Sequence, residues 1–184
     1  MEIKKYKLTE EIIKVDNSIL YRIEALRDFN DVKKGDKGGF VEKEENLSQY
    51  GDSWVYDDAM VFGNAEVYYN ARVHDNAIVR GKAVVFDDAE VLDNAVVYDK
   101  AEIYGNARVF GNAEIGGDAK VESAADYIVF KNWWSSGRYF TWTRTNNMWK
   151  VGCFYGTGEQ LIEKAYNDSE KSGREYEKIV RYTK

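Results

Sequence analysis

Aromatic and cationic side chains, the types best suited to binding a flat ligand or a partner, are concentrated in one stretch of the C-terminal third of the sequence. Aromatic faces beside guanidinium or ammonium groups stack nucleic-acid bases and bind nucleotides. Tryptophan also makes good core for a small domain, so the pattern leaves a core and a ligand or partner surface both open. The candidate binding residues are Trp133, Trp134, Arg138, Tyr139, Trp142, Arg144, Trp149 and Lys150.

Other reactive groups in the sequence are few. Thr157 and Gln160 have the spacing of a capping box, which predicts a helix whose first N–H groups suit an anion. Cys153, the single cysteine, has no histidine or second cysteine near it and is interpreted as a small buried hydrophobe. Metal-ligand spacing does not occur, so no metal site is expected. The glycine-rich stretch from Lys34 to Gly39 lacks the Gly-Lys-Ser/Thr ending of a phosphate-binding loop and is interpreted as a turn.

A short repeat must position these groups. Between Ser53 and Glu122 an aliphatic residue stands at every sixth position, twelve times, and a small residue stands two positions before each. A period of six predicts a solenoid of short strands, with the small and aliphatic residues inside and Gly, Asn or Asp at the corners. Three sides close a triangular coil of eighteen residues, so the twelve hexads predict four coils. Val41 and Leu47 lie six apart and in phase with Ser53, which predicts a less regular coil before the four regular ones.

Residues eighteen apart should then lie above one another on the outer surface. The second and third sides of the predicted coil carry more apolar outward residues than the scattered exposure of a monomer. We therefore expect the protein to form a homo-oligomer, a dimer or a trimer, unless the N-terminal hairpin folds over the second side. The candidate interface residues are Met60, Phe62, Ile78, Val96, Tyr98, Tyr68, Phe86 and Tyr104.

A ladder of acids is predicted at one corner, at Asp57, Asp75 and Asp93. Carboxylates in successive coils, about 5 Å apart, repel one another unless water or a cation lies between them. The acidic shaft could mimic the charge of a nucleic-acid backbone. The alternative interpretation is that the acids keep the protein soluble and prevent edge pairing.

His74 is the only histidine of the chain and is predicted to point outward. Tyr56, Leu92 and Phe110 occupy the same outward position in neighbouring coils. A ring of this size fits the position, so the pattern favours a stacked surface residue over a catalytic one.

The hexads resemble those of left-handed parallel β-helix proteins, a group that includes the hexapeptide acyltransferases. The ends resemble the caps of bacteriophage and prophage proteins that are loosely described as polymer-forming or as transferases. That second resemblance rests on Lys5-Tyr6-Lys7-Leu8-Thr9, Leu20-Tyr21-Arg22-Ile23, Asp31-Val32-Lys33-Lys34-Gly35-Asp36, Gly38-Gly39-Phe40 and Gly152-Cys153-Phe154-Tyr155-Gly156-Thr157. The resemblance of the hexads implies a left-handed coil, and the resemblance of the ends implies an association with phages. The acyltransferases commonly use a histidine as general base, which implies such a role for His74 with coenzyme A or acetyl-CoA as donor. The unbroken hexads leave no long loop to build an acceptor pocket.

Three segments are expected in this mainly β chain. Residues 1–40 alternate apolar and polar residues around Asp16-Asn17-Ser18, which predicts a hairpin cap. Residues 41–125 form the β-helix. Residues 126–184 form a small α+β cap, with strands over 127–130, 138–143 and 148–151 and a helix from Thr157. A break at Ser172-Gly173 separates a second short helix over 175–182.

The charge is negative and uneven. The chain carries −6 overall, and residues 51–125 alone hold 14 acidic and 6 basic residues. An acidic shaft does not favour nucleic-acid binding. The single cysteine suits a reducing compartment, and the sequence shows neither a signal peptide nor a membrane-spanning run. We expect the protein in the cytoplasm of the host cell, without a membrane partner.

These patterns favour a non-enzymatic phage-type scaffold or binding protein that needs no cofactor. It would present the aromatic and basic cap and the acidic shaft to a host protein, for example as an inhibitor of a defence system. The first alternative is a coenzyme A-dependent hexapeptide acyltransferase with His74 as base. The second alternative is a sponge that sequesters a nucleotide signal.

Overall fold

The computed structural model describes residues 4–133 and 137–183 of the chain. The chain divides into two compact units, residues 1–126 and residues 127–184. We call them the solenoid unit and the C-terminal unit and describe each by itself. Trp134 lies outside the described residues.

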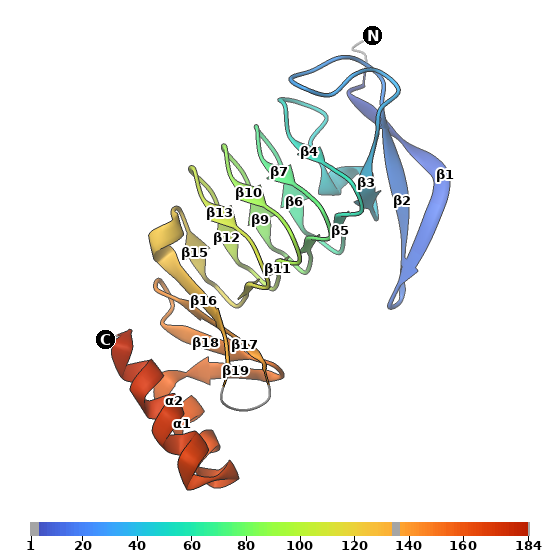
Figure 1. Ribbon diagram of the computed structural model, residues 1–184. Coiled ribbons are helices and arrows are strands. Elements are labelled where there is room, and N and C mark those ends of the chain that lie inside the picture. Colours follow the sequence, from blue (N-terminus) through green and yellow to red (C-terminus); the bar gives the residue numbers. More distant parts are fainter. Residues whose placement is uncertain (1–3, 134–136, 184) are drawn as a thin grey trace. The chain divides into compact units, whose positions relative to one another are not determined.

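The solenoid unit is a β-solenoid built from twelve two-residue strands (Figure 1). Each strand pairs in parallel with the strand eighteen residues later, as in Trp54 with Arg72 and Val55 with Val73. The strands are β4 (Trp54–Val55), β5 (Met60–Val61), β6 (Glu66–Val67), β7 (Arg72–Val73), β8 (Ile78–Val79), β9 (Val84–Val85), β10 (Glu90–Val91), β11 (Val96–Val97), β12 (Glu102–Ile103), β13 (Arg108–Val109), β14 (Glu114–Ile115) and β15 (Lys120–Val121). The predicted four coils are confirmed. The left hand of the coil stays a prediction.

An irregular coil precedes the regular ones, as predicted, but its register differs. It contains β3 (Lys37–Val41) and the 3-10 turn η1 (Glu44–Asn46). Val41 aligns with Val61, and Leu47 bridges to Val67, so both occupy aliphatic positions and not the small positions that the phase with Ser53 predicts. The segment between Leu47 and Val55 holds two residues more than a hexad, which shifts the phase.

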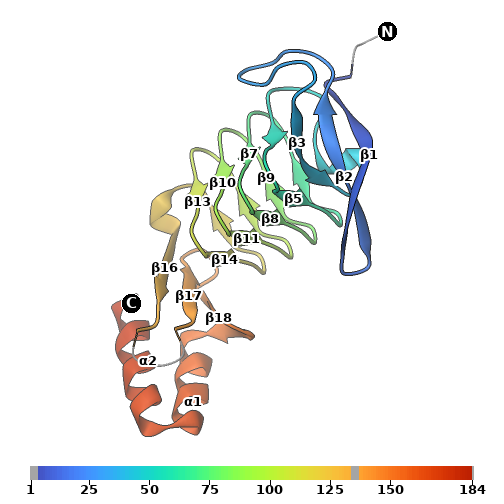
Figure 2. The same ribbon diagram turned by 45° about the vertical axis from the view of Figure 1, so that its right-hand side comes forward.

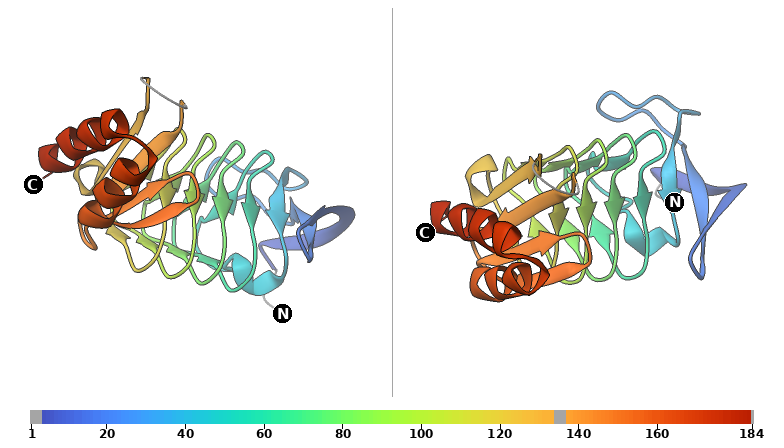
Figure 3. Two further views of the ribbon diagram at one scale, coloured as in Figure 1. Left: turned by 90° about the horizontal axis from the view of Figure 1, so that it is seen from below. Right: turned by 60° about the horizontal axis from the view of Figure 1, so that its bottom comes forward.

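The interior of the solenoid is a stack of alanine and aliphatic side chains that are fully buried. A narrow prism of this kind has room for one small and one aliphatic residue on each side, valine in most coils and isoleucine at positions 103 and 115, because protein interiors are close-packed. The first residue of each corner has a positive φ, which glycine and aspartate supply in most coils. At Gly51 a Cβ would lie 2.5 Å from the carbonyl oxygen of Tyr69, so the corner there requires glycine. Figure 3 shows the corners of successive coils following one another along the shaft.

The N-terminal hairpin extends one side of the solenoid. Strands β1 (Tyr6–Val15) and β2 (Ser18–Ala25) pair antiparallel around a turn at Asp16. β2 pairs with β3, and β3 pairs with β5, which gives a seven-stranded sheet in the order β1-β2-β3-β5-β8-β11-β14. The hairpin therefore joins the sheet edge to edge (Figure 2). It does not fold over the second side, the possibility that the sequence left open.

Side chains of the N-terminal segment bury the first outward tryptophan. Trp54 is 1% exposed and packs edge-on against Tyr6 and Phe29, with ring centroids 6.1 and 5.3 Å away. Lys5 lies in the same cluster and donates hydrogen bonds from Nζ to the carbonyl oxygen and Oγ of Ser53, at 2.8 and 3.1 Å. These contacts close the N-terminal end of the core.

The C-terminal unit is a four-stranded antiparallel sheet with two helices. The sheet order is β16 (Tyr127–Lys131), β17 (Tyr139–Thr143), β18 (Met148–Val151) and β19 (Phe154–Thr157), and the 3-10 turn η2 (Ala124–Asp126) precedes it. Helices α1 (Gly158–Asp168) and α2 (Glu170–Tyr182) pack on each other. The capping box of Thr157 and Gln160 is present as predicted.

Three details of this unit differ from the predictions. The expected burial of Cys153 is wrong, because the residue lies exposed in the turn between β18 and β19. β19 was missed, since the sequence analysis ended the sheet at β18. The expected break at Ser172-Gly173 is wrong, because α2 starts at Glu170 and runs through Gly173. A Cβ at Gly173 would lie 2.2 Å from the ring of Tyr166, so this glycine lets the two helices approach closely. Ser169 caps the helix by accepting a hydrogen bond from the N–H of Ser172.

Candidate functional site

His74 is held in a stack of rings on the outer surface of the solenoid. Its ring lies 4.3 Å from that of Tyr56, with an angle of 6° between the two planes. The Tyr56 hydroxyl donates a hydrogen bond to Asp31 at 2.9 Å, which fixes the neighbouring ring. Burial lowers the pKa of His74 below its ordinary value, against the opposing effect of Glu90 and Asp75. The imidazole is thus a neutral ring with one face covered at neutral pH.

The acids at Asp57, Asp75 and Asp93 form the predicted ladder, and each one holds the next coil. The carboxylate of Asp57 accepts a hydrogen bond from the N–H of Asp75 at 3.3 Å, and that of Asp75 accepts one from Asp93 at 3.1 Å. Asp93 in turn accepts from the N–H of Gly111 at 2.9 Å. Asp75 is therefore occupied by the backbone and does not orient His74. Among the residues that the structure describes, no group of three His, Cys, Asp or Glu is placed to hold a metal ion.

The outward apolar residues are half-buried by their neighbours in adjacent coils. On the third side Tyr68, Phe86 and Tyr104 stack with centroids 5.3 and 5.2 Å apart, so their faces contact each other. On the second side Tyr98 is buried, and the guanidinium of Arg80 lies 5.2 Å above its ring. The remaining candidate interface residues, Met60, Phe62, Ile78 and Val96, are half-buried on that side.

The aromatic and basic stretch divides between core and surface in the C-terminal unit. Trp142 and Trp149 face each other across β17 and β18 and join Phe140 in the core, with 8% and 1% of their surface exposed. The indole N–H of Trp142 donates to Asn147 at 3.0 Å. Both tryptophans were grouped with the candidate partner-binding residues, and the structure places them in the core because the helices pack on this face of the sheet.

The exposed members of the stretch gather mainly at the connection between β16 and β17. Trp133 is 87% exposed, and Tyr139 is 36% exposed with the ammonium of Lys131 5.8 Å from its ring centre. Arg138 is also exposed there. We call Lys131, Trp133, Arg138 and Tyr139 the loop patch. Arg144 is exposed after the other end of β17, and Lys150 is half-buried with its ammonium on the carbonyl of Gly152.

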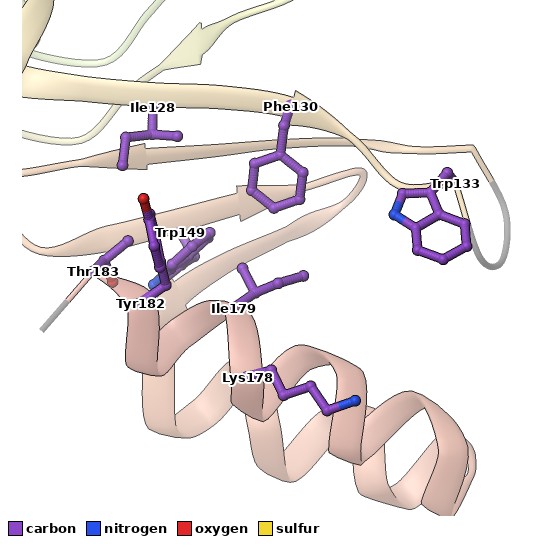
Figure 4. Close-up of a pocket in the computed structure, with 8 residues that line it drawn as sticks. All are labelled: Ile128, Phe130, Trp133, Trp149, Lys178, Ile179, Tyr182 and Thr183. Carbon is purple, nitrogen blue, oxygen red and sulfur yellow. The ribbon is translucent and has the colours of Figure 1, made fainter.

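A cavity of about 400 Å³ lies in the same unit, between β16, β18 and α2 (Figure 4). Ile128 and Phe130 form one wall, and Ile179 and Tyr182 form the opposite wall. Its full lining is Ile128, Phe130, Trp133, Trp149, Lys178, Ile179, Tyr182 and Thr183. Ligand pockets typically have this size and this mostly apolar lining.

Trp149 brings one polar group to the cavity. Its indole nitrogen is turned toward Tyr182 and Thr183 (Figure 4). Among the described residues no hydrogen bond from this N–H occurs, and the nitrogen is not one of the buried polar atoms that lack a partner, so solvent reaches it. The hydroxyl of Thr183 donates to the carbonyl of Val180 at 2.9 Å.

Comparison with known proteins concerns the solenoid. The family model for the YdcK beta solenoid repeat matches residues 101–117, about one coil. The repeat is of the hexapeptide β-solenoid type. The chain is also similar to the uncharacterized acetyltransferase YdcK of Escherichia coli (strain K12), with 38% identity over 61 residues. That match covers 29% of this chain and 19% of YdcK, so the chain spans about a fifth of its relative.

The hexapeptide solenoid therefore has a recognisable relative, whereas the cavity lies in the C-terminal unit, outside the family match. Sequence reasoning missed most of its lining, because β16 and α2 are about fifty residues apart in the chain. The sequence held only weak indications of the cavity. Ile128 and Phe130 lie two apart on β16, and Ile179 and Tyr182 lie three apart on α2, so each pair shares a face of its element. None of the described helices is long and apolar enough to span a membrane.

Proposed function

We propose that this β-solenoid protein is a non-enzymatic binding protein. The solenoid is a rigid support, and the C-terminal unit carries the binding site. The observation that carries the proposal is the apolar cavity beside the exposed loop patch, in a unit that has its own core. A mostly apolar pocket with a few polar groups is a natural candidate for a binding site.

The outer face of the solenoid supports the same division of roles. A general base must reach the proton that it removes, with a free ring nitrogen beside an acceptor pocket. His74 is half-buried in its ladder, and its ring face is covered by Tyr56. The acids of the corner bind backbone N–H groups. These side chains serve the stacking of coils.

The partner in this proposal is a host protein met in the host cytoplasm, in line with the phage resemblance of the chain ends. An inhibitor of a defence system would fit. Tryptophan, tyrosine and arginine are the residue types that dominate binding energy at protein interfaces. Trp133, Tyr139 and Arg138 supply all three within the loop patch, and all are exposed.

The test is purification of the tagged chain from host cells, followed by native mass spectrometry. We expect a co-purifying species that is lost when Trp133→Ala and Tyr139→Ala are combined. Ile12→Ala with Tyr50→Ala is the matched control, since both residues are exposed in the solenoid unit, at 47% and 68%. Equal recovery of the species with both double variants would contradict the assignment of the site.

A homo-oligomer is part of this proposal. The second side carries Met60, Ile78 and Val96 in adjacent coils, and none of them is fully buried within the chain. A second copy would cover them with an identical surface. Native mass spectrometry of the same samples tests this, with a dimer or trimer expected and Ile78→Lys returning it to a monomer.

A coenzyme A-dependent acyltransferase is the second candidate, because the relative YdcK is named an acetyltransferase. In that reaction His74 would take the proton of the acceptor hydroxyl or amine as the acceptor attacks the acetyl carbonyl carbon. The C–S bond of the thioester would then break, and the coenzyme A thiolate would leave and take up a proton. The lowered pKa of His74 keeps the ring neutral, as a base requires. Acetyl-CoA turnover that disappears in His74→Ala would establish this function and displace the first.

A further inference from the structure

We propose that the cavity of the C-terminal unit binds a planar heteroaromatic ring that carries a hydrogen-bond acceptor, and that the indole N–H of Trp149 donates to this acceptor. The inference rests on the proposed function, since it uses the same unit. It goes further by assigning the ligand class and the group that recognises it.

The walls of the cavity suit a flat ring. Ile128 and Phe130 project from β16 toward Ile179 and Tyr182 of α2, and the space between them is open (Figure 4). The Phe130 ring is already held in place by stacking on Phe140, with centroids 5.0 Å apart. Aromatic rings gain from contact with such apolar and aromatic walls, in stacked or edge-on arrangements. The space of about 400 Å³ is large enough to admit a bicyclic ring.

The donor selects an acceptor on that ring. Trp149 is 1% exposed, and its indole N–H has no hydrogen-bond partner among the described residues. Indole is a donor only, so an acceptor on a ligand in the cavity would give this N–H a protein–ligand hydrogen bond in place of one to solvent. A ring nitrogen or carbonyl placed near Tyr182 and Thr183 would satisfy it.

Water and ions fit the cavity less well than a neutral ring. A buried water needs two to four polar partners, and apolar side chains form most of this lining. Lys178, the cationic residue of the lining, forms an ion pair with Glu175 at 2.8 Å. The positive charge at the mouth of the cavity is therefore balanced. An uncharged heteroaromatic ring therefore matches the site better than a phosphate or a carboxylate does.

The test compares quinoline with indole as probes for the whole chain at neutral pH. The two are flat bicycles of similar size, but quinoline has a ring nitrogen that accepts a hydrogen bond and indole has only a donor. Two-dimensional ¹H–¹⁵N NMR follows the tryptophan indole N–H signals during each titration. We expect quinoline to bind roughly five-fold more tightly than indole, the contribution of one hydrogen bond, and to move the Trp149 signal downfield.

Three variants distinguish the contribution of the cavity walls to binding from that of the indole N–H donor. Trp149→Phe should abolish the preference for quinoline. Tyr182→Ala removes an exposed wall without disturbing the core and should weaken both probes by roughly five-fold. Tyr50→Ala changes another exposed tyrosine, in the solenoid unit (68% exposed against 88% for Tyr182), and should change neither affinity. If Trp149→Phe does not fold, the indole signal of the unaltered chain and the Tyr182→Ala variant still decide the question.

Equal affinity for the two probes, or binding that leaves the Trp149 signal in place, would overturn the inference. So would the absence of binding by either probe. These failures are distinct from failure of the proposed function, because partner capture is expected to depend on Tyr139, which does not line the cavity, whereas ring binding depends on Trp149 and Tyr182. A chain that captures its partner and ignores quinoline keeps the first proposal and loses this one.

Discussion

In the solenoid unit most groups meet a counterpart eighteen residues further along the chain, whereas residues of the C-terminal unit have no repeated neighbour. Tyr68, Phe86 and Tyr104 cover one another, and Asp57 and Asp75 each bind the following coil. In the C-terminal unit Trp149 lines the cavity, and Trp133 is 87% exposed. The comparison shows that many outward side chains of the repeat contact their equivalents in the next coil, a kind of contact that the C-terminal unit cannot make.

The largest loss of stability should come from placing a charge inside the repeat. Val85 is fully buried in the middle of the solenoid, so Val85→Asp would bury an unpaired charge. We expect a loss of more than about 4 kcal/mol in the free energy of unfolding of the solenoid unit. Urea titration followed by circular dichroism measures it. The tryptophan signal of the C-terminal unit should keep its own transition, and a common shift of both transitions would refute the independence of the units.

The second largest effect is a dependence of stability on pH, which arises from Lys5 at the N-terminal end of the core. Burial, and next the charge of Arg27, lowers the pKa of Lys5 from 10.5 to about 7. Between these values the unfolded chain holds a proton that the folded chain has released, so stability rises with pH and is lowest once both forms are protonated. We expect a gain of roughly 2–3 kcal/mol between about pH 7.5 and about pH 9.5.

Lys5→Met provides the control for this titration. It removes the ammonium and keeps most of the packing against Phe29, so the rise of stability with pH should flatten over the same interval. Unfolding in urea at a series of pH values gives both curves. Parallel curves for the two proteins would assign the pH dependence to other groups.

A smaller effect is expected at the acid corner. Asp75 has a φ of 56° and accepts the N–H of Asp93. Asp75→Ala loses the hydrogen bond and strains the backbone, which should cost about 1–2 kcal/mol. Asp75→Gly loses only the hydrogen bond and should cost less, and thermal unfolding of both variants separates the two causes. An alanine variant as stable as the glycine variant would show that the corner is not strained.

The smallest effect should be at His74, if the ring only fills its place in the ladder. His74→Phe keeps the stack on Tyr56 and should change stability by no more than about 0.5 kcal/mol at neutral pH. The histidine takes up its proton more readily in the unfolded chain, so its presence lowers stability as the pH falls below its ordinary pKa. The phenylalanine variant should therefore be the more stable protein in acid, by thermal melts across that range.

The repeat was predictable from the sequence because each hexad records its own inward and outward positions locally. The register of the first coil was not, since the extra residues between Leu47 and Val55 follow no period. Whether Trp142 and Trp149 are core or surface depends on the helices that cover them, and a stretch rich in tryptophan is compatible with both outcomes. The cavity depends on Phe130 and Tyr182, which only the folded chain brings together.

The hydrogen bond from each corner acid to the following coil also makes the shaft a structure of adjustable length. A regular coil offers its successor the same carboxylate, the same N–H groups and the same alanine and valine layer that it received from its predecessor. Duplication or deletion of eighteen residues within the regular coils would leave both ends intact and change the axial length by about 4.8 Å. Evolution or design can thus alter the length of the shaft in fixed steps of one coil.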